Sequence, residues 1–184
     1  SAASDVYKRQ VSVYVSESFL EKPEHEKCLQ GYRYEVVSDA VFREISDTQT
    51  PQGILAIVRM PKYDLPDLLQ GDHTHLLILE SVQDPGNLGT MVRTGEGAGI
   101  TGIIMNKTTV DLFNPKTIRS TMGSIYRVPY LITEHLPDLL DELHKENIRL
   151  YAAHLKGDTY YDAFDFTGAC GFLIGNEGNG LSDE

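Results

Sequence analysis

The sequence is short of cysteine, tryptophan and long apolar runs. Its 184 residues contain two cysteines and no tryptophan. Two cysteines this far apart exclude a disulfide framework and a cysteine-based zinc site, and they favour a reducing, cytoplasmic setting. No apolar run approaches the roughly 18 residues that a membrane helix requires, so we expect no membrane partner. His73 and His75 have no third ligand nearby in the sequence, and we therefore predict no metal site.

Basic residues are also scarce, with 16 Lys and Arg against 27 Asp and Glu, a net charge of −11. This balance argues against RNA binding, because phosphate contacts favour Lys and Arg. The charge is unevenly distributed, however. Residues 87–127 carry five basic and two acidic side chains, whereas residues 134–165 carry eight acidic and three basic ones. The basic segment, which includes Lys116 and Arg119, is compatible with RNA binding without requiring it.

The larger part of the chain, residues 74–184, alternates short apolar strands with helices. This alternation predicts an α/β fold in which a mostly parallel sheet is covered by helices on both faces. The expected strands are 75–79, 102–105, 128–132, 148–153 and 171–174. The expected helices are 88–98, 115–122 and a third helix whose leucines form one apolar stripe over 136–143.

The residues before this region predict three further segments. Residues 1–10 match no periodic pattern, and we expect them to be a non-native or junction segment. Residues 11–60 predict a small α/β domain. Its expected strands are 11–15, 34–37 and 53–58, and its helices are 17–30, interrupted by Pro23, and 39–45, capped by Asp39. Residues 61–73 contain two prolines and are interpreted as a linker with one helical turn.

The first candidate motif lies in the strand–turn–helix of residues 75–98. The turn Asp84-Pro85-Gly86-Asn87 stops the strand and starts the helix, with Asn87 at its head. The helix is otherwise rich in small or apolar residues, so Arg93 requires a carboxylate or phosphate partner. A surface pair with Glu96, one turn further on, is the alternative.

The second candidate motif closes the chain. An apolar strand runs directly into Gly175-Asn176-Glu177-Gly178-Asn179-Gly180, and three glycines in six residues permit positive φ angles and close approach of a ligand to the backbone. A Rossmann dinucleotide site requires GxGxxG after the first strand and an acidic residue about twenty residues later, and neither is present.

Together, NLGTMVRT and IGNEGNGLS resemble the first and second signature motifs of the SpoU/TrmH family of RNA 2'-O-ribose methyltransferases. Residues 120–124, followed by Val128-Pro129, are similar to a further step of that family. The resemblance implies a knotted α/β fold, S-adenosylmethionine as cofactor, and methyl transfer to a ribose 2'-hydroxyl in RNA. It also implies a homodimer for the full-length protein. Residues 11–60 resemble part of the small RNA-binding domain that often precedes this domain, which favours ribosomal over transfer RNA.

The resemblance assigns catalytic roles to Arg93, Asn87 and Glu177. We expect Arg93 to orient the ribose-phosphate and to stabilise negative charge on the reacting oxygen, because arginine stays protonated and is a poor general base. The RNA's own phosphate is a candidate proton acceptor. Glu177 is expected to pair with Arg93, or else to cap the glycine turn. Asn87 is expected to position RNA or arginine, or to serve only as an N-cap.

The remaining assignments concern the cofactor and the RNA. Cofactor binding is assigned to Gly175, Asn176, Gly178 and Gly180, and RNA binding to Arg93, Ser124, Arg119 and Lys116. For Ser124 a structural role near a helix end is the alternative.

One departure from the family is the third motif, which would follow residue 184. We therefore expect residues 1–184 to be a fragment of a longer protein that binds cofactor weakly or not at all and is inactive alone. A natural truncation is the alternative. The alternative function is a non-catalytic RNA-binding module. A nucleotide-binding enzyme of another kind is a third possibility, which rests only on the glycine loop.

Overall fold

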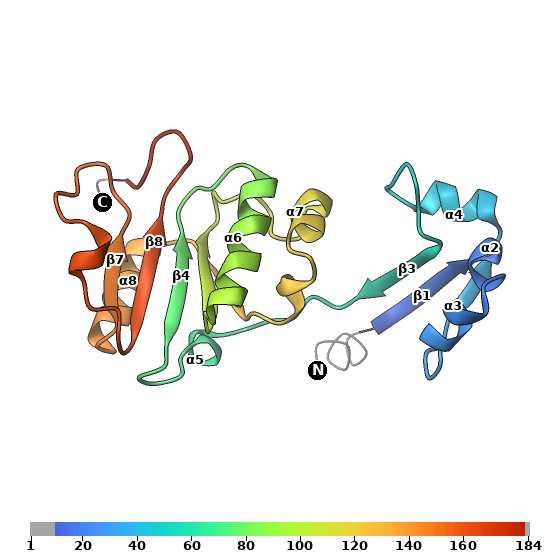
Figure 1. Ribbon diagram of the computed structural model, residues 1–184, viewed down its shortest axis with the longest axis horizontal. Coiled ribbons are helices and arrows are strands. Elements are labelled where there is room, and N and C mark those ends of the chain that lie inside the picture. Colours follow the sequence, from blue (N-terminus) through green and yellow to red (C-terminus); the bar gives the residue numbers. More distant parts are fainter. Residues whose placement is uncertain (1–9, 183–184) are drawn as a thin grey trace. The chain divides into compact units, whose positions relative to one another are not determined.

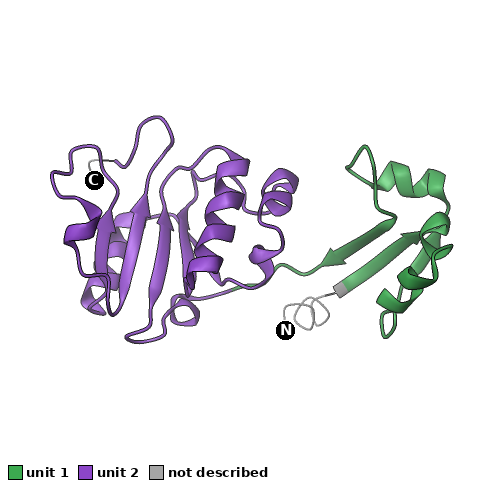
Figure 2. Ribbon diagram, in the orientation of Figure 1, with its two compact units in different colours: residues 1–62 green, residues 63–184 purple. Residues whose placement is uncertain are grey.

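The structure is a computed structural model, and it describes residues 10–182. The chain divides into two compact units, residues 1–62 and residues 63–184 (Figure 2). Of the segment expected to be a junction, residues 1–9 lie outside the described part, and Gln10 begins the first strand. Within the described part, no helix is long and apolar enough to cross a membrane.

The first unit is a three-stranded sheet with short helices (Figure 1). The central strand is parallel to one neighbour and antiparallel to the other. Its elements are β1 (Gln10–Ser16), α2 (Glu17–Leu20), α3 (Pro23–Cys28), β2 (Glu35–Val37), α4 (Asp39–Ile45) and β3 (Ile54–Val58), with sheet order β2-β1-β3.

Two details of this unit bear on the sequence prediction. The helical stretch expected over residues 17–30 is divided at Pro23, as predicted, because Pro23 lacks an N–H group and occupies the first turn of a new helix. The predicted cap of α4 is wrong: the cap is Ser38 rather than Asp39, since the Ser38 hydroxyl accepts a hydrogen bond from Val41 N.

The second unit is a five-stranded sheet in which every strand pair is parallel (Figure 1). Its strands are β4 (His75–Leu79), β5 (Gly102–Asn106), β6 (Tyr130–Thr133), β7 (Arg149–Ala152) and β8 (Cys170–Ile174), in the order β6-β5-β4-β8-β7. Its helices are α5 (Leu65–Leu68), α6 (Pro85–Ala98), α7 (Pro115–Ser120) and α8 (Leu136–Lys145), with 3₁₀ turns η1 (Ser124–Tyr126) and η2 (Tyr161–Ala163). The predicted α/β fold with a mostly parallel sheet is confirmed.

Alternation along β4 explains the two layers of helices. Leu77 and Leu79 face one side and pack with α6, whereas Leu76 and Ile78 face the other and pack with α5 and α8. All four side chains are buried, as expected for a parallel strand that is covered on both faces.

The segment expected to be a linker, residues 61–73, differs from that expectation. From residue 63 onward it belongs to the second compact unit. Leu68 of α5 is fully buried against β5, where a β-carbon added at Gly102 would lie 2.3 Å from Leu68 Cγ. Pro66, in the first turn of α5, therefore belongs to a packed segment and not to a linker.

Two boundaries near α7 also differ. The helix expected over residues 115–122 ends at Ser120, because Met122 and Gly123 have left-handed φ angles of 51° and 89°. The strand expected from residue 128 begins at Tyr130, since Val128 N is hydrogen-bonded to Ser124 O at 3.2 Å.

The strand order reverses at β4. The chain runs from β4 through β5 to β6 on one side, while β8 and β7 lie on the other. In open α/β sheets, ligands bind beyond the carboxyl ends of the strands where the order reverses. We therefore expect a ligand-binding site at the loops that follow β4 and β8.

Candidate active site

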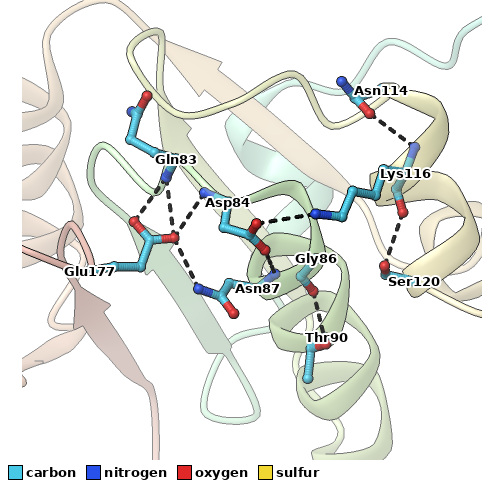
Figure 3. A network of polar contacts seen from close by, with 9 residues as sticks. All are labelled: Gln83, Asp84, Gly86, Asn87, Thr90, Asn114, Lys116, Ser120 and Glu177. Atoms are coloured by element: carbon cyan, nitrogen blue, oxygen red, sulfur yellow. Dashed lines mark hydrogen bonds and ion pairs between the residues drawn. The ribbon is translucent and has the colours of Figure 1, made fainter.

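The Glu177 carboxylate joins the two motifs at the carboxyl edge of the sheet (Figure 3). It accepts hydrogen bonds from the backbone N–H of Gln83 at 3.0 Å and of Asp84 at 3.0 Å, and from Asn87 Nδ2 at 3.2 Å. These bonds, led by those from the Gln83 and Asp84 backbone, lower the pKa of Glu177 to about 2. The loops after β4 and β8 are thus held together by one ionised side chain.

Asp84 is the N-cap of α6. One of its carboxylate oxygens accepts a hydrogen bond from Asn87 N at 2.7 Å, and the other forms an ion pair with Lys116 Nζ at 3.3 Å (Figure 3). The Asn87 backbone bond is the main cause that lowers the pKa of Asp84. The alternative N-cap role for Asn87 is therefore wrong, since the helix begins two residues before it. The Asp-Pro pair was the sequence signal for this cap.

Asn176 organises the glycine loop. Its Oδ1 atom accepts hydrogen bonds from Gly178 N and Asn179 N, both at 2.9 Å, and its Nδ2 atom donates to Ser81 O at 2.9 Å. Ser81 adopts a left-handed φ of 56° and donates its N–H to Asn106 Oδ1 at 2.9 Å. Neither Ser81 nor Asn106 stands in a recognisable motif, so the sequence alone did not point to them.

The glycines of this loop have different structural roles. A β-carbon at Gly175 would lie 2.2 Å from the Gly180 carbonyl carbon, so this glycine permits the loop to close through paired backbone bonds between Asn176 and Gly180. A β-carbon at Gly180 would have no atom within 4 Å, although its φ of 74° favours glycine. Gly175 therefore closes the loop, and Gly180 leaves an open backbone surface.

A hollow of about 730 Å³ lies against the glycine loop. It is lined by residues 153–156 after β7, residues 174–181, and Met91 of α6. Its volume falls within the range of about 300–1,000 Å³ that is common for small-molecule sites. The absence of side chains at Gly178 and Gly180 lets a ligand lie close to the loop backbone, so the residues present are compatible with S-adenosylmethionine.

Arg93 lies on an exposed part of α6. Within residues 10–182, its guanidinium makes no hydrogen bond or ion pair. The predicted pair with Glu177 is absent there because the Glu177 carboxylate is bonded to the β4–α6 loop and Asn87. The alternative pair with Glu96 is also absent, since Glu96 pairs with Arg127.

The other residues assigned to RNA lie in different environments. Ser124 is 1% exposed, and its hydroxyl donates to Glu96 Oε2 at 2.6 Å, which supports the structural alternative. Lys116 is exposed but paired with Asp84. Arg119 is exposed and, within the described part of the chain, has no ion-pair partner. In that same part, no three His, Cys, Asp or Glu side chains are grouped so that they could hold a metal.

The profile of the SpoU rRNA Methylase family matches residues 74–184, which is more than half of the chain. The chain belongs to the SpoU rRNA methylase family. A second profile, for the substrate-binding domain of RNA 2'-O ribose methyltransferases, matches residues 4–64. The resemblance inferred from the two motifs is thereby confirmed. The roles of the individual site residues remain predictions.

Curated relatives include 23S rRNA (guanosine(2553)-2'-O)-methyltransferase RlmP of Bacillus subtilis, which is 34% identical over 151 residues. That alignment covers 82% of this chain and 58% of the relative. RlmB of Xylella fastidiosa, a 23S rRNA (guanosine-2'-O-)-methyltransferase, is 33% identical over 68% of this chain and 52% of its own length. The chain thus spans somewhat more than half the length of these relatives.

Solved structures of the family have the same fold. The SpoU methyltransferase AviRb of Streptomyces viridochromogenes, in complex with AdoMet, aligns with a TM-score of 0.86 and 24% identity, covering 99% of this chain and 71% of that one. The AdoMet-bound rRNA methyltransferase of Sinorhizobium meliloti aligns with a TM-score of 0.81 and 28% identity, covering 98% and 68%.

Proposed function

We propose that this SpoU family member takes part in transferring a methyl group from S-adenosylmethionine to a ribose 2'-hydroxyl of RNA. The main support is the exposed Arg93 guanidinium, which has no ion-pair partner within residues 10–182 and lies on the helix that the Glu177 carboxylate joins to the glycine loop. Family membership and the names of the relatives support the reaction class.

In this proposal, each group of the chain has a separate task. S-adenosylmethionine, when bound, supplies an electrophilic methyl group on a sulfonium. Gly178 and Gly180 present backbone atoms to the hollow, and Asn176 and Glu177 keep the glycine loop against the β4–α6 loop. Arg93 donates hydrogen bonds to the ribose-phosphate and stabilises the negative charge that develops on the reacting oxygen.

A transfer assay tests this proposal. The protein encoded by the complete reading frame is incubated with methyl-labelled S-adenosylmethionine and unmodified ribosomal RNA. The RNA is then hydrolysed with alkali. We expect the label in alkali-resistant dinucleotides, because a 2'-O-methyl group blocks cleavage at its own position. Label in the bases, or RNA binding without transfer, would contradict the proposal, and the latter result would favour the RNA-binding module.

We propose ribosomal RNA rather than transfer RNA as the substrate. Both relatives described above are named for 23S rRNA, and the profile match over residues 4–64 supports an RNA-binding role for the first unit. Transfer RNA in the same assay is the matched comparison, and preferential labelling of transfer RNA would overturn this choice.

We also propose a cytoplasmic location, for which the free Cys28 and Cys170 are the support.

We further propose that the full-length protein is a homodimer. The support is an apolar hollow of about 410 Å³ between α6, β4 and β8, to which Met91, Thr94, Ala98 and Phe172 contribute. Burial of this apolar lining by a second copy of the chain would favour association. Ala98→Arg is expected to shift the sedimentation coefficient from dimer to monomer, and an unchanged dimer would exclude this surface.

A further inference from the structure

Three carboxylates lie on or beside α6, and each has a partner other than Arg93. Asp84 is paired with Lys116, Glu177 is bonded to the β4–α6 loop, and Glu96 is paired with Arg127. Both cations involved come from segments that follow β5, Lys116 from α7 and Arg127 from the position after η1. Each of the three acids is thus already bonded to a group other than Arg93.

Glu96 is held most completely. Arg127 contacts it through two nitrogens, Nε to Oε1 and Nη2 to Oε2, the latter at 2.7 Å, and the buried Ser124 hydroxyl adds a bond to Oε2 at 2.6 Å. These contacts, led by Arg127, lower the pKa of Glu96 to about 2. Glu96 therefore stays ionised, and both of its oxygens are engaged.

Glu96 is also the acid best placed to bind Arg93. It lies three residues further along the same helix, and side chains at this spacing are neighbours, with β-carbons about 5–6 Å apart. A Glu96 freed from Arg127 would be a fixed intramolecular anion in competition with an RNA phosphate for the same guanidinium.

We propose that Arg127 is a positioning residue for the RNA site, because its pairing with Glu96 keeps Arg93 available to the substrate. This inference rests on the proposed function, in which Arg93 contacts the ribose-phosphate. The plain alternative is that the Glu96–Arg127 pair only ties α6 to η1. The two accounts differ in what they predict when both charges are removed.

The test compares kcat/KM for RNA in Arg127→Gln and in Glu96→Gln/Arg127→Gln. In the single variant, kcat/KM for RNA is expected to fall about two- to fivefold, which is the effect of one exposed ion pair that competes with substrate. In the double variant, kcat/KM is expected to return to the wild-type value, since no carboxylate remains beside Arg93. A double variant as impaired as the single one would overturn the proposal and support the structural tie. KM for S-adenosylmethionine is expected to remain constant.

Two controls exclude a general charge effect. Adding Glu134→Gln to Arg127→Gln restores the net charge without removing the acid beside Arg93, so recovery there would contradict the proposal. Arg149→Gln removes an exposed arginine at the opposite, amino-terminal end of β7 and is expected to have no effect. Arg127→Lys keeps a cation beside Glu96 but loses the two-nitrogen contact, so its kcat/KM is expected to fall less than that of Arg127→Gln, and it keeps the test open if Arg127→Gln does not fold.

Arg93→Ala separates failure of this inference from failure of the proposed function. If Arg93→Ala retains full transfer, the proposed function fails. If Arg93→Ala abolishes transfer but Arg127→Gln has the wild-type rate, only the inference about Arg127 fails. In the Arg93→Ala background, Arg127→Gln is expected to cause no further loss, because its target is already absent.

Discussion

Among single residues, Glu177 and Glu96 are the two carboxylates whose pKa is lowered furthest, each to about 2. The causes differ. Glu177 accepts mainly backbone N–H groups, whereas Glu96 accepts mainly an arginine and a serine hydroxyl. Both are bonded across elements, so their ionisation contributes to the stability of the fold.

These pKa values predict a loss of stability in acid. A carboxyl whose folded pKa lies below its unfolded value of about 4.3 stabilises the protein above that pH. The contribution is lost as pH falls from about 4.3 toward 2. We expect Glu96→Gln to reduce this acid-induced loss by about 1 kcal/mol after screening, measured by urea unfolding at pH 6 and pH 3. An identical pH dependence in the variant would contradict this assignment.

Residue types were predicted more reliably than residue partners. The motifs identified Arg93, Asn87 and Glu177, and the structure brings Asn87 and Glu177 together at 3.2 Å. The sequence could not show that Glu177 bonds to backbone N–H groups of Gln83 and Asp84, because every residue except proline carries such a donor. The choice between competing donors is set by loop conformation, which a motif does not encode.

Among the elements, α6 depends on close packing against α7. A β-carbon at Gly89 would lie 2.4 Å from Ser120 Cβ and 2.7 Å from the Thr117 carbonyl oxygen. These atoms belong to the neighbouring helix, and the carbonyl is part of its backbone, so neither can move far without shifting α7. This contact fixes α6, and with it the position of Arg93.

The packing at Gly89 gives a prediction with a matched control on the same helix. Gly89→Ala is expected to destabilise the protein by about 1–3 kcal/mol, because α6 and α7 must separate. Gly97→Ala meets no atom within 4 Å and is expected to stabilise it by about 0.5–1 kcal/mol through helix propensity. Thermal unfolding measures both. Equal effects of the two substitutions would mean that the helices are not in this close contact.

The helix α5 carries a second prediction at this scale. Leu68 is fully buried, so Leu68→Ala is expected to cost about 2–5 kcal/mol. Leu155, which is 96% exposed, provides the control, and its replacement by alanine is expected to change stability by less than about 0.5 kcal/mol. Denaturant unfolding that is insensitive to Leu68→Ala would restore the linker interpretation. With four residues, α5 is too short for periodicity to reveal its buried face.

For the whole molecule, the order of the strands in the sheet could not be predicted from the sequence. Apolar runs and helix signals are local, so they predicted a mostly parallel α/β sheet and placed most elements within two residues. The position of β8 between β4 and β7 depends on pairing over nearly 100 residues, such as His75 with Cys170. Only that pairing brings the glycine loop beside the β4–α6 loop.

Within the basic segment of residues 87–127, few cations are free to contact RNA. Of the five basic residues in 87–127, Lys107, Lys116 and Arg127 are engaged by carboxylates. Arg119 is therefore expected to make about one phosphate contact. Arg119→Ala should weaken RNA binding and reduce the salt dependence of log K by about one unit. A binding titration at several salt concentrations measures this, and an unchanged slope would exclude the contact.

The proposed function depends above all on the contact between Arg93 and the RNA ribose. Its decisive test measures transfer rate, RNA affinity and S-adenosylmethionine binding for Arg93→Ala beside the wild-type protein. We expect kcat to fall about 100-fold or more, as for the loss of a charge-stabilising donor, while S-adenosylmethionine binding is retained. Methyl transfer by the variant at the wild-type rate would show that Arg93 does not act on the ribose.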